Sequence, residues 1–87
     1  MLVMVAEDDG LHRAFVRNII EHLWPGNVEV IETARGDVAM DLARNREPPY
    51  VVLDLQLPKA TGIVQYYGHV HPVVNSSVSL RLLQRWC

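Results

Sequence analysis

Two short apolar runs, each followed at once by acidic residues, dominate the pattern of hydrophobic and polar positions along the chain. The run 51–53 (Val-Val-Leu) leads directly into Asp54, and the run 2–6 (Leu-Val-Met-Val-Ala) leads into Glu7 and Asp8. Continuous apolar runs of this length are typical of strands buried on both faces of a parallel sheet. Open α/β sheets place ligands and chemistry at the carboxyl ends of such strands. The pattern therefore predicts that these acids gather in one crevice.

The segment after the first acids has helical periodicity. Its apolar residues recur every three or four positions, and its polar side carries Arg13, Arg17 and Glu21, which predicts an amphipathic helix. Asp8 or Asp9 is expected to cap the start of this helix. The apolar stripe consists of Leu11, Phe15, Val16, Ile19, Ile20 and Leu23.

The pattern then alternates between strand and helix. Residues 28–32 alternate apolar and polar side chains and predict a strand. A second helix is expected to start at the turn 35–37 and to stop at 47–49, where two prolines follow a glutamate, and residues 50–53 form the next strand. The first 54 residues thus read β-α-β-α-β, which predicts an α/β fold with a parallel sheet and right-handed crossovers.

Beyond residue 62 the pattern weakens. Residues 63–71, with Gly68 among them, favour either a short helix or a strand-rich segment. Residues 72–74 predict a short strand, and the leucines and tryptophan within 80–86 indicate a short amphipathic helix.

Composition and charge narrow the class of protein. With 87 residues, of which 49% are hydrophobic, the chain is expected to fold as a single domain over 1–87. A formal net charge of −2 gives no indication of a nucleic-acid-binding surface. The one cysteine, Cys87, excludes a disulfide within the chain and suits a reducing compartment. The apolar run 2–6 is too short for a signal peptide or a membrane span, so a cytoplasmic protein is expected.

The acids at the ends of the two runs indicate a particular chemistry. Oxygen ligands from Glu7, Asp8 and Asp54 suit Mg²⁺ better than Zn²⁺. Crowded carboxylates resist ionising together unless a cation neutralises them. With such a cation present, one carboxylate could attack phosphorus and become an aspartyl phosphate. The alternative, which the residues alone leave open, is a set of separate surface acids that end strands and cap helices.

Three motifs, in this order and spacing, resemble the receiver domain of two-component response regulators. They are residues 5–9 (Val-Ala-Glu-Asp-Asp), 33–39 (Thr-Ala-Arg-Gly-Asp-Val-Ala) and 51–58 (Val-Val-Leu-Asp-Leu-Gln-Leu-Pro), the last followed by Thr-Gly at 61–62. The resemblance covers residues 2–62, about two-thirds of the chain. It implies a flavodoxin-like fold, in which a parallel sheet lies between two layers of helices.

The resemblance also implies roles for individual residues. Asp54 would accept a phosphoryl group from a sensor histidine kinase or a phosphotransfer protein. Mg²⁺ would be held by Asp8, Asp54, the backbone carbonyl of Gln56 and, through a water molecule, Glu7.

The remaining residues, 63–87, depart from the family. They have no room for a fifth strand and fifth helix, so an incomplete sheet of about four strands is expected. Residues 72–77 weakly resemble the family's fourth strand, which makes Ser77 the candidate switch hydroxyl. The family's phosphate-binding lysine has no counterpart, since the only lysine, Lys59, lies in the loop after Asp54. The chain is expected to be a truncated, frame-altered or naturally divergent receiver.

Three functions compete on this reading. The first is a phosphoacceptor signalling domain, which is not an enzyme. The second is a degenerate receiver that acts only in protein interaction or dimerisation. The third is a phosphatase with an aspartyl nucleophile, and it ranks last because Gln56 stands where a second acid is usual. An open sheet edge and the apolar tail 78–86 predict a homodimer.

The two histidines His69 and His71 are expected to be surface residues and not metal ligands.

Overall fold

The computed structural model describes residues 1–69 and 71–76 of the chain. The predictions for Ser77, for the apolar tail 78–86 and for Cys87 lie outside the described residues. The elements in chain order are β1 (Leu2–Ala6), α1 (Gly10–Leu23), β2 (Glu29–Thr33), α2 (Gly36–Arg46), β3 (Tyr50–Leu53), α3 (Ala60–Tyr67) and β4 (Val73–Asn75).

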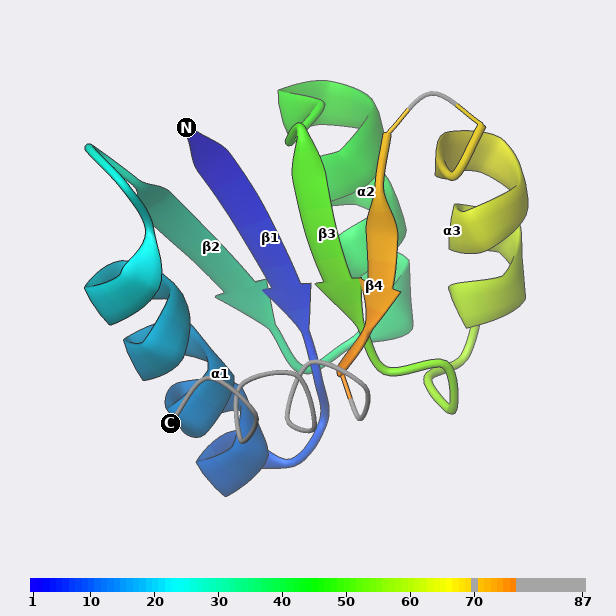
Figure 1. Cartoon of the computed structure of the whole chain (residues 1–87). Coiled ribbons are helices and arrows are strands. Elements are labelled where there is room, and N and C mark those ends of the chain that lie inside the picture. The colour runs from blue at the N-terminus through cyan, green and yellow to red at the C-terminus, as the bar shows by residue number, and fades with distance from the viewer. Residues whose placement is uncertain (70, 77–87) are drawn as a thin grey trace.

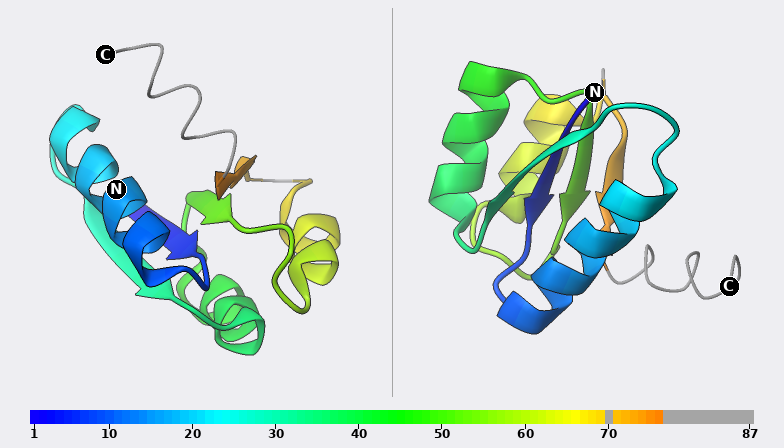
Figure 2. Two further views of the ribbon diagram at one scale, coloured as in Figure 1. Left: turned by 90° about the horizontal axis from the view of Figure 1, so that it is seen from below. Right: turned by 90° about the vertical axis from the view of Figure 1, so that its left-hand side faces the viewer.

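The four strands form one parallel sheet in the order β2-β1-β3-β4. This order and the alternation of strands with helices confirm the predicted flavodoxin-like α/β fold. Helix α1 covers one face of the sheet, and α2 and α3 cover the other (Figures 1 and 2). No helix within the described ranges is long and apolar enough to cross a membrane.

The register of the strands brings their carboxyl ends to one edge of the sheet. Ala6, the last residue of β1, pairs with Thr33 of β2 and with Leu53 of β3. Leu53 in turn pairs with Asn75 of β4. The residues that follow these strands therefore emerge side by side, in the lower part of Figure 1.

The larger core lies between the sheet and helices α2 and α3. Met4, Leu53 and Ile63 are fully buried in it, and burying one such side chain contributes about 1.5–3 kcal/mol. Gly36, the first residue of α2, touches the loop after β3, because a Cβ built on it would lie 1.7 Å from the carbonyl oxygen of Pro58. The start of α2 thus packs directly on the backbone of that loop.

The core on the other face of the sheet is small. It consists of Val5, Val16 and Val52, with partly buried neighbours. The predicted apolar stripe of α1 is only partly buried, since Leu11 is 87% exposed and Phe15 is 48% exposed. Among the described residues α1 is the only helix on this face, so only the side of α1 that points at the sheet is buried.

Most of the segment 63–71, for which the sequence pattern favoured either a short helix or a strand-rich segment, belongs to helix α3. Helix α3 begins at Ala60, two residues before Gly62, so the predicted start at residue 63 was too late. The Tyr67 hydroxyl donates a hydrogen bond to the carbonyl oxygen of Pro48, and burial, together with the nearby charge of Glu47, raises the pKa of Tyr67. The ring of His71 stacks on Tyr67 with 4.5 Å between centroids.

Candidate functional site

A pocket of about 430 Å³ lies at the carboxyl edge of the sheet. Residues from the ends of β1, β3 and β4 and from the start of α1 surround it. They are Glu7, Asp8, Asp9, His12, Asp54, Leu55, Gln56 and Asn75. The structure therefore gathers the acids of the two apolar runs in one crevice, as the strand pattern predicted.

Three of these acids lie close enough together to share one ion. Carboxylate oxygens of Glu7, Asp8 and Asp54 lie within 4.8 Å of one another. Glu7 is buried, Asp54 is half-buried and Asp8 is exposed. The sheet holds this spacing directly, because the amide of Asp54 donates a hydrogen bond of 2.8 Å to the carbonyl of Ala6. Within the described ranges this is the one group of three potential metal ligands, and His69 and His71 are not part of it.

The carboxylate of Asp54 is oriented by the loop that follows it. Its Oδ1 accepts a hydrogen bond of 2.9 Å from the amide of Gln56. The backbone carbonyl of Asp54 accepts a further bond of 3.1 Å from the amide of Leu57. Gln56, two residues after Asp54, lies in the wall of the pocket.

Glu7 is held by donors on both of its oxygens. Its side chain is buried, yet the described residues place no lysine or arginine beside its carboxylate. Oε1 accepts from the amide of Asp9 at 3.2 Å, and Oε2 accepts from the hydroxyl of Ser76 at 2.7 Å. Ser76 is itself 1% exposed. The hydroxyl that the structure brings to the acids is thus that of Ser76, whereas the predicted Ser77 lies outside the described residues.

Sequence reasoning missed Ser76 because the resemblance of residues 72–77 to the family's fourth strand made Ser77 the candidate hydroxyl. A signal for it was present, since Ser76 directly follows β4 as Glu7 follows β1 and Asp54 follows β3. In a parallel sheet, residues that follow neighbouring strands reach the same edge.

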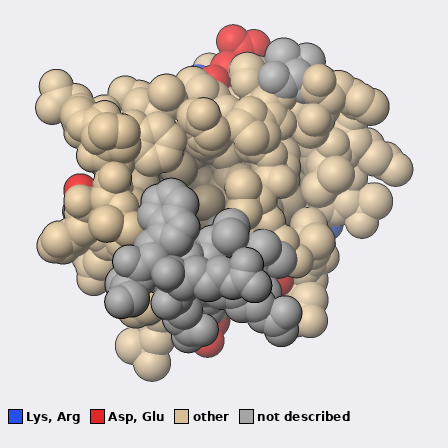
Figure 3. All heavy atoms as spheres, in the orientation of Figure 1, with Lys and Arg blue, Asp and Glu red and all other residues tan. Residues whose placement is uncertain are grey.

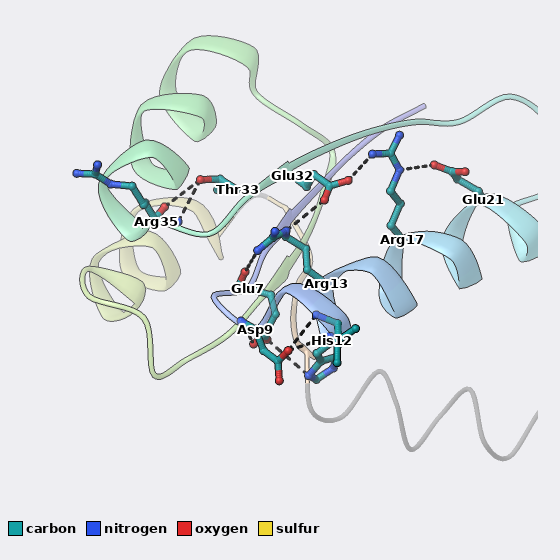
Figure 4. A network of polar contacts seen from close by, with 10 residues as sticks. Glu7, Asp9, His12, Arg13, Arg17, Glu21, Glu32, Thr33 and Arg35 are labelled. Atoms are coloured by element: carbon teal, nitrogen blue, oxygen red, sulfur yellow. Dashed lines mark hydrogen bonds and ion pairs between the residues drawn. The ribbon is translucent and has the colours of Figure 1, made fainter.

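Arg13 anchors the loop that carries Glu7. Its Nη1 donates to the Glu7 carbonyl at 2.8 Å, and its Nε donates to Glu32 at 3.2 Å (Figure 4). Arg17, which also pairs with Glu21, donates to the other oxygen of Glu32. Burial raises the pKa of Glu32, but the hydrogen bonds from Arg17 and Arg13 outweigh burial and hold that pKa below its usual range. The predicted polar side of α1 is therefore also a clamp on the site.

The donor set of the pocket fits a hard divalent cation. All three clustered ligands are carboxylates, the class of ligand that Mg²⁺ takes in proteins. No lysine or arginine is among the described residues that line the pocket. Lys59 is exposed at the start of α3, in a left-handed conformation with φ of 68°, and is not part of the lining.

Comparison with characterised proteins finds response regulators among the relatives of this chain. The chain is 38% identical over 61 residues to the polar-differentiation response regulators DivK of Brucella anthropi, Brucella ovis and Brucella melitensis. The matched stretch makes up 70% of this chain and 47% of each relative, so the chain spans about half the length of the relatives it matches. No family model matches the chain.

The hydrogen bond between Ser76 and Glu7 gives the first prediction. Replacing Ser76→Ala leaves a buried oxygen of Glu7 without this donor, so the free energy of unfolding should fall by about 1–3 kcal/mol. Urea denaturation measures the change. In a Glu7→Leu background the same replacement should cost much less, because the acceptor is already gone. An equal cost in both backgrounds would show that Ser76 acts through packing and not through Glu7.

Proposed function

Because homology to the DivK response regulators supports a response regulator receiver domain in this chain, we propose that Asp54 is its phosphoacceptor in a two-component system. The observation that carries the proposal is the clustering of Asp54 with Glu7 and Asp8. Their oxygens lie within 4.8 Å of one another at the carboxyl edge of the sheet. A half-buried carboxylate in such a pocket is accessible to a donor and is held in a fixed orientation by the Gln56 amide.

The proposed donor is a phosphohistidine on a sensor histidine kinase or a phosphotransfer protein. Oδ1 of Asp54 is oriented by the Gln56 amide, and the other oxygen, Oδ2, attacks phosphorus. A P–O bond to Asp54 forms while the P–N bond to the histidine breaks. The electron pair of that bond passes to the ring nitrogen, which takes up a proton. The products are the aspartyl phosphate and a neutral histidine.

The proposed cofactor is Mg²⁺, held by Glu7, Asp8, Asp54 and the backbone carbonyl of Gln56. When bound, it would neutralise the negative charge of the carboxylates and of the transferred phosphoryl group. The contribution of the protein itself is to hold the carboxylates in fixed positions around the proposed ion. Glu7 is fixed by Ser76 and by the Asp9 amide, Asp54 by the Gln56 amide, and exposed Asp8 completes the set from the solvent side.

The second prediction concerns Asp54 itself. Incubation of the full-length protein with acetyl phosphate and Mg²⁺ should add the mass of one phosphoryl group, because this small donor needs no kinase. Intact-protein mass spectrometry measures the product. Asp54→Asn should abolish the added mass, since an amide is not a nucleophile at this position.

Asp41→Asn is the matched control, because Asp41 is an exposed aspartate of α2 away from the pocket. It should be modified as well as the unaltered protein. A protein that never gains mass under these conditions, although it is folded, contradicts the phosphoacceptor function.

The third prediction concerns the cation. Mg²⁺ should bind weakly and reversibly, because three carboxylates and water form an open oxygen shell. Asp8→Asn should weaken this binding, since it removes one anionic ligand and leaves the buried Glu7 in place. Titration followed by backbone amide shifts of residues in the pocket measures both proteins, with Asp41→Asn again as the control. An identical response of Asp8→Asn and the unaltered protein would exclude Asp8 from the site.

A second candidate function, an interaction module that self-associates, is favoured by the face that carries α1. Leu11 is 87%, Phe15 48% and Leu23 50% exposed on one helix. On this face, acidic and basic atoms appear only at the margins and beside the grey residues (Figure 3). Within the described ranges β4 lies at one edge of the sheet, next to β3. Exposed apolar patches and open sheet edges both favour contact with another chain.

The fourth prediction follows from this face. Light scattering at micromolar concentration should give the mass of a dimer, with reductant present so that Cys87 cannot cross-link two chains. Phe15→Glu should shift the mass to that of a monomer, because it places a charge in the contact. Asn45→Glu, at an exposed position of α2 on the opposite face of the sheet, is the charge-matched control and should leave the dimer intact. A monomer mass for the unaltered reduced protein would contradict self-association.

A further inference from the structure

The loop between β3 and α3 carries the backbone groups that orient Asp54. The amide of Gln56 donates to Oδ1 of Asp54 at 2.9 Å, and the amide of Leu57 donates to the carbonyl of Asp54 at 3.1 Å. The side chain of Leu57 is buried in the larger core, whereas residues 55, 56, 58 and 59 are exposed. The position of this loop therefore depends on few contacts with the rest of the molecule.

One of these contacts comes from Gly36, the first residue of α2. Gly36 is buried, and the three atoms nearest to a Cβ built on it all belong to the backbone of Pro58. The carbonyl oxygen would lie at 1.7 Å, the carbonyl carbon at 2.8 Å and the Cα atom at 3.6 Å. A side chain at position 36 would thus overlap with main chain, which cannot turn aside as the end of a flexible side chain can.

Lack of space, and not backbone conformation, explains the glycine at position 36. Among the described glycines, only Gly26 has a positive φ. Gly36 is in the helical conformation, which any residue adopts without strain. The close approach of the Pro58 carbonyl is therefore the feature that a larger residue would destroy.

Helix α2 is the less movable partner in this contact. Its Ala39 and Ala43 are 0% and 1% exposed, so the helix packs closely in the larger core. A side chain at position 36 would therefore displace mainly the exposed loop. Pro58 lies two residues after Gln56, so the displacement would reach the amide that orients Asp54.

We propose that Gly36, through its contact with Pro58, is a positioning residue for Asp54, although it is not part of the lining of the pocket. The absence of a side chain lets the start of α2 hold the loop where the Gln56 amide meets Oδ1 of Asp54. The inference rests on the proposed phosphoacceptor function and adds a residue from another element that controls the reactivity of Asp54.

The test measures the initial rate at which acetyl phosphate and Mg²⁺ modify the full-length protein, by intact-protein mass spectrometry. Gly36→Ala should lower this rate about tenfold or more, because misplacing a reacting group by about 1 Å can lower a rate about a hundredfold. Circular dichroism establishes that the variant is folded under the conditions of the assay.

Gly68→Ala is the matched control for loss of stability. A Cβ at Gly68 would lie 2.6 Å from the carbonyl oxygen of Val64, so this variant also forces main chain to move. Gly68 lies at the other end of α3 and does not line the pocket. Gly68→Ala should therefore be less stable than the unaltered protein but be modified within about twofold of its rate.

A second readout needs neither a phosphoryl donor nor Mg²⁺. In Gly36→Ala the amide proton of Gln56 should shift upfield in the NMR spectrum, because it loses its acceptor on Asp54. The amide proton of Asp54, which donates to the carbonyl of Ala6 within the sheet, should stay in place. Gly68→Ala should leave both amide protons unchanged.

Pro58→Gly approaches the same contact from the loop and decides the question if Gly36→Ala does not fold. It adds no volume, but it gives the loop the backbone freedom of glycine, so Gly36 no longer contacts a rigid loop. The rate of modification should fall about threefold or more. Pro25→Gly, in the exposed turn after α1, is the control and should keep the rate of the unaltered protein.

The outcomes separate this inference from the phosphoacceptor function. If the unaltered protein is modified, and Gly36→Ala or Pro58→Gly keeps its rate within about twofold, the positioning role is overturned and the phosphoacceptor function stands. If the unaltered protein gains no mass, the phosphoacceptor function falls, and the amide proton of Gln56 alone decides whether Gly36 holds the loop. A Gln56 amide proton that does not move in folded Gly36→Ala would overturn the inference in either case.

Discussion

The register between β1 and β3 is the constraint on which the rest of the structure depends. It sets the acid after β1 beside the acid after β3, and it thereby crowds carboxylates into one pocket. Like charges at this separation repel, and more strongly where water is excluded. Hydrogen-bond donors from the surrounding elements stabilise these carboxylates. Glu7 accepts from the hydroxyl of Ser76, at the end of β4, and from the amide of Asp9, and Asp54 accepts from the amide of Gln56. The arginine clamp on Glu7 and the contact of Gly36 with Pro58 hold the two acidic loops at the same spacing.

The two faces of the sheet have unequal tasks. The face covered by α2 and α3 carries most of the fully buried side chains and supplies most of the apolar burial. The face covered by α1 has a core of three buried valines, and much of the apolar surface of α1 remains in contact with solvent. The layer of α2 and α3 thus contributes most to the stability of the fold, whereas α1 positions residues of the pocket and leaves apolar side chains exposed to solvent.

The pattern of the sequence predicted most of the fold, because short apolar or alternating runs bounded by turn residues alternate with longer segments of helical period through the first five elements. Strand β1 and helix α1 lie where the pattern placed them, and β2 is shifted by one residue. Helix α3 was harder, because the pattern weakens beyond residue 62 and Gly68 lies in the segment that follows. Gly62 itself lies within the helix, close to the side chain of Met40. In the pocket, the acids were predictable from their place after apolar runs. The pairing of Ser76 with Glu7 was not, since it depends on the tertiary placement of a three-residue strand.

The bond between Ser76 and Glu7 also has a consequence for how the molecule folds. Its partners are 69 residues apart in the chain, so it closes one of the longest loops available to this sequence. Contacts of such separation form late, because the entropy of closing the loop must be overcome before the contact stabilises anything. Strand β1 ends directly before this loop, and β2, β3 and β4 lie within it. A nascent or partly folded chain therefore has Glu7 open to water, and the buried acid appears only when the whole sheet has assembled.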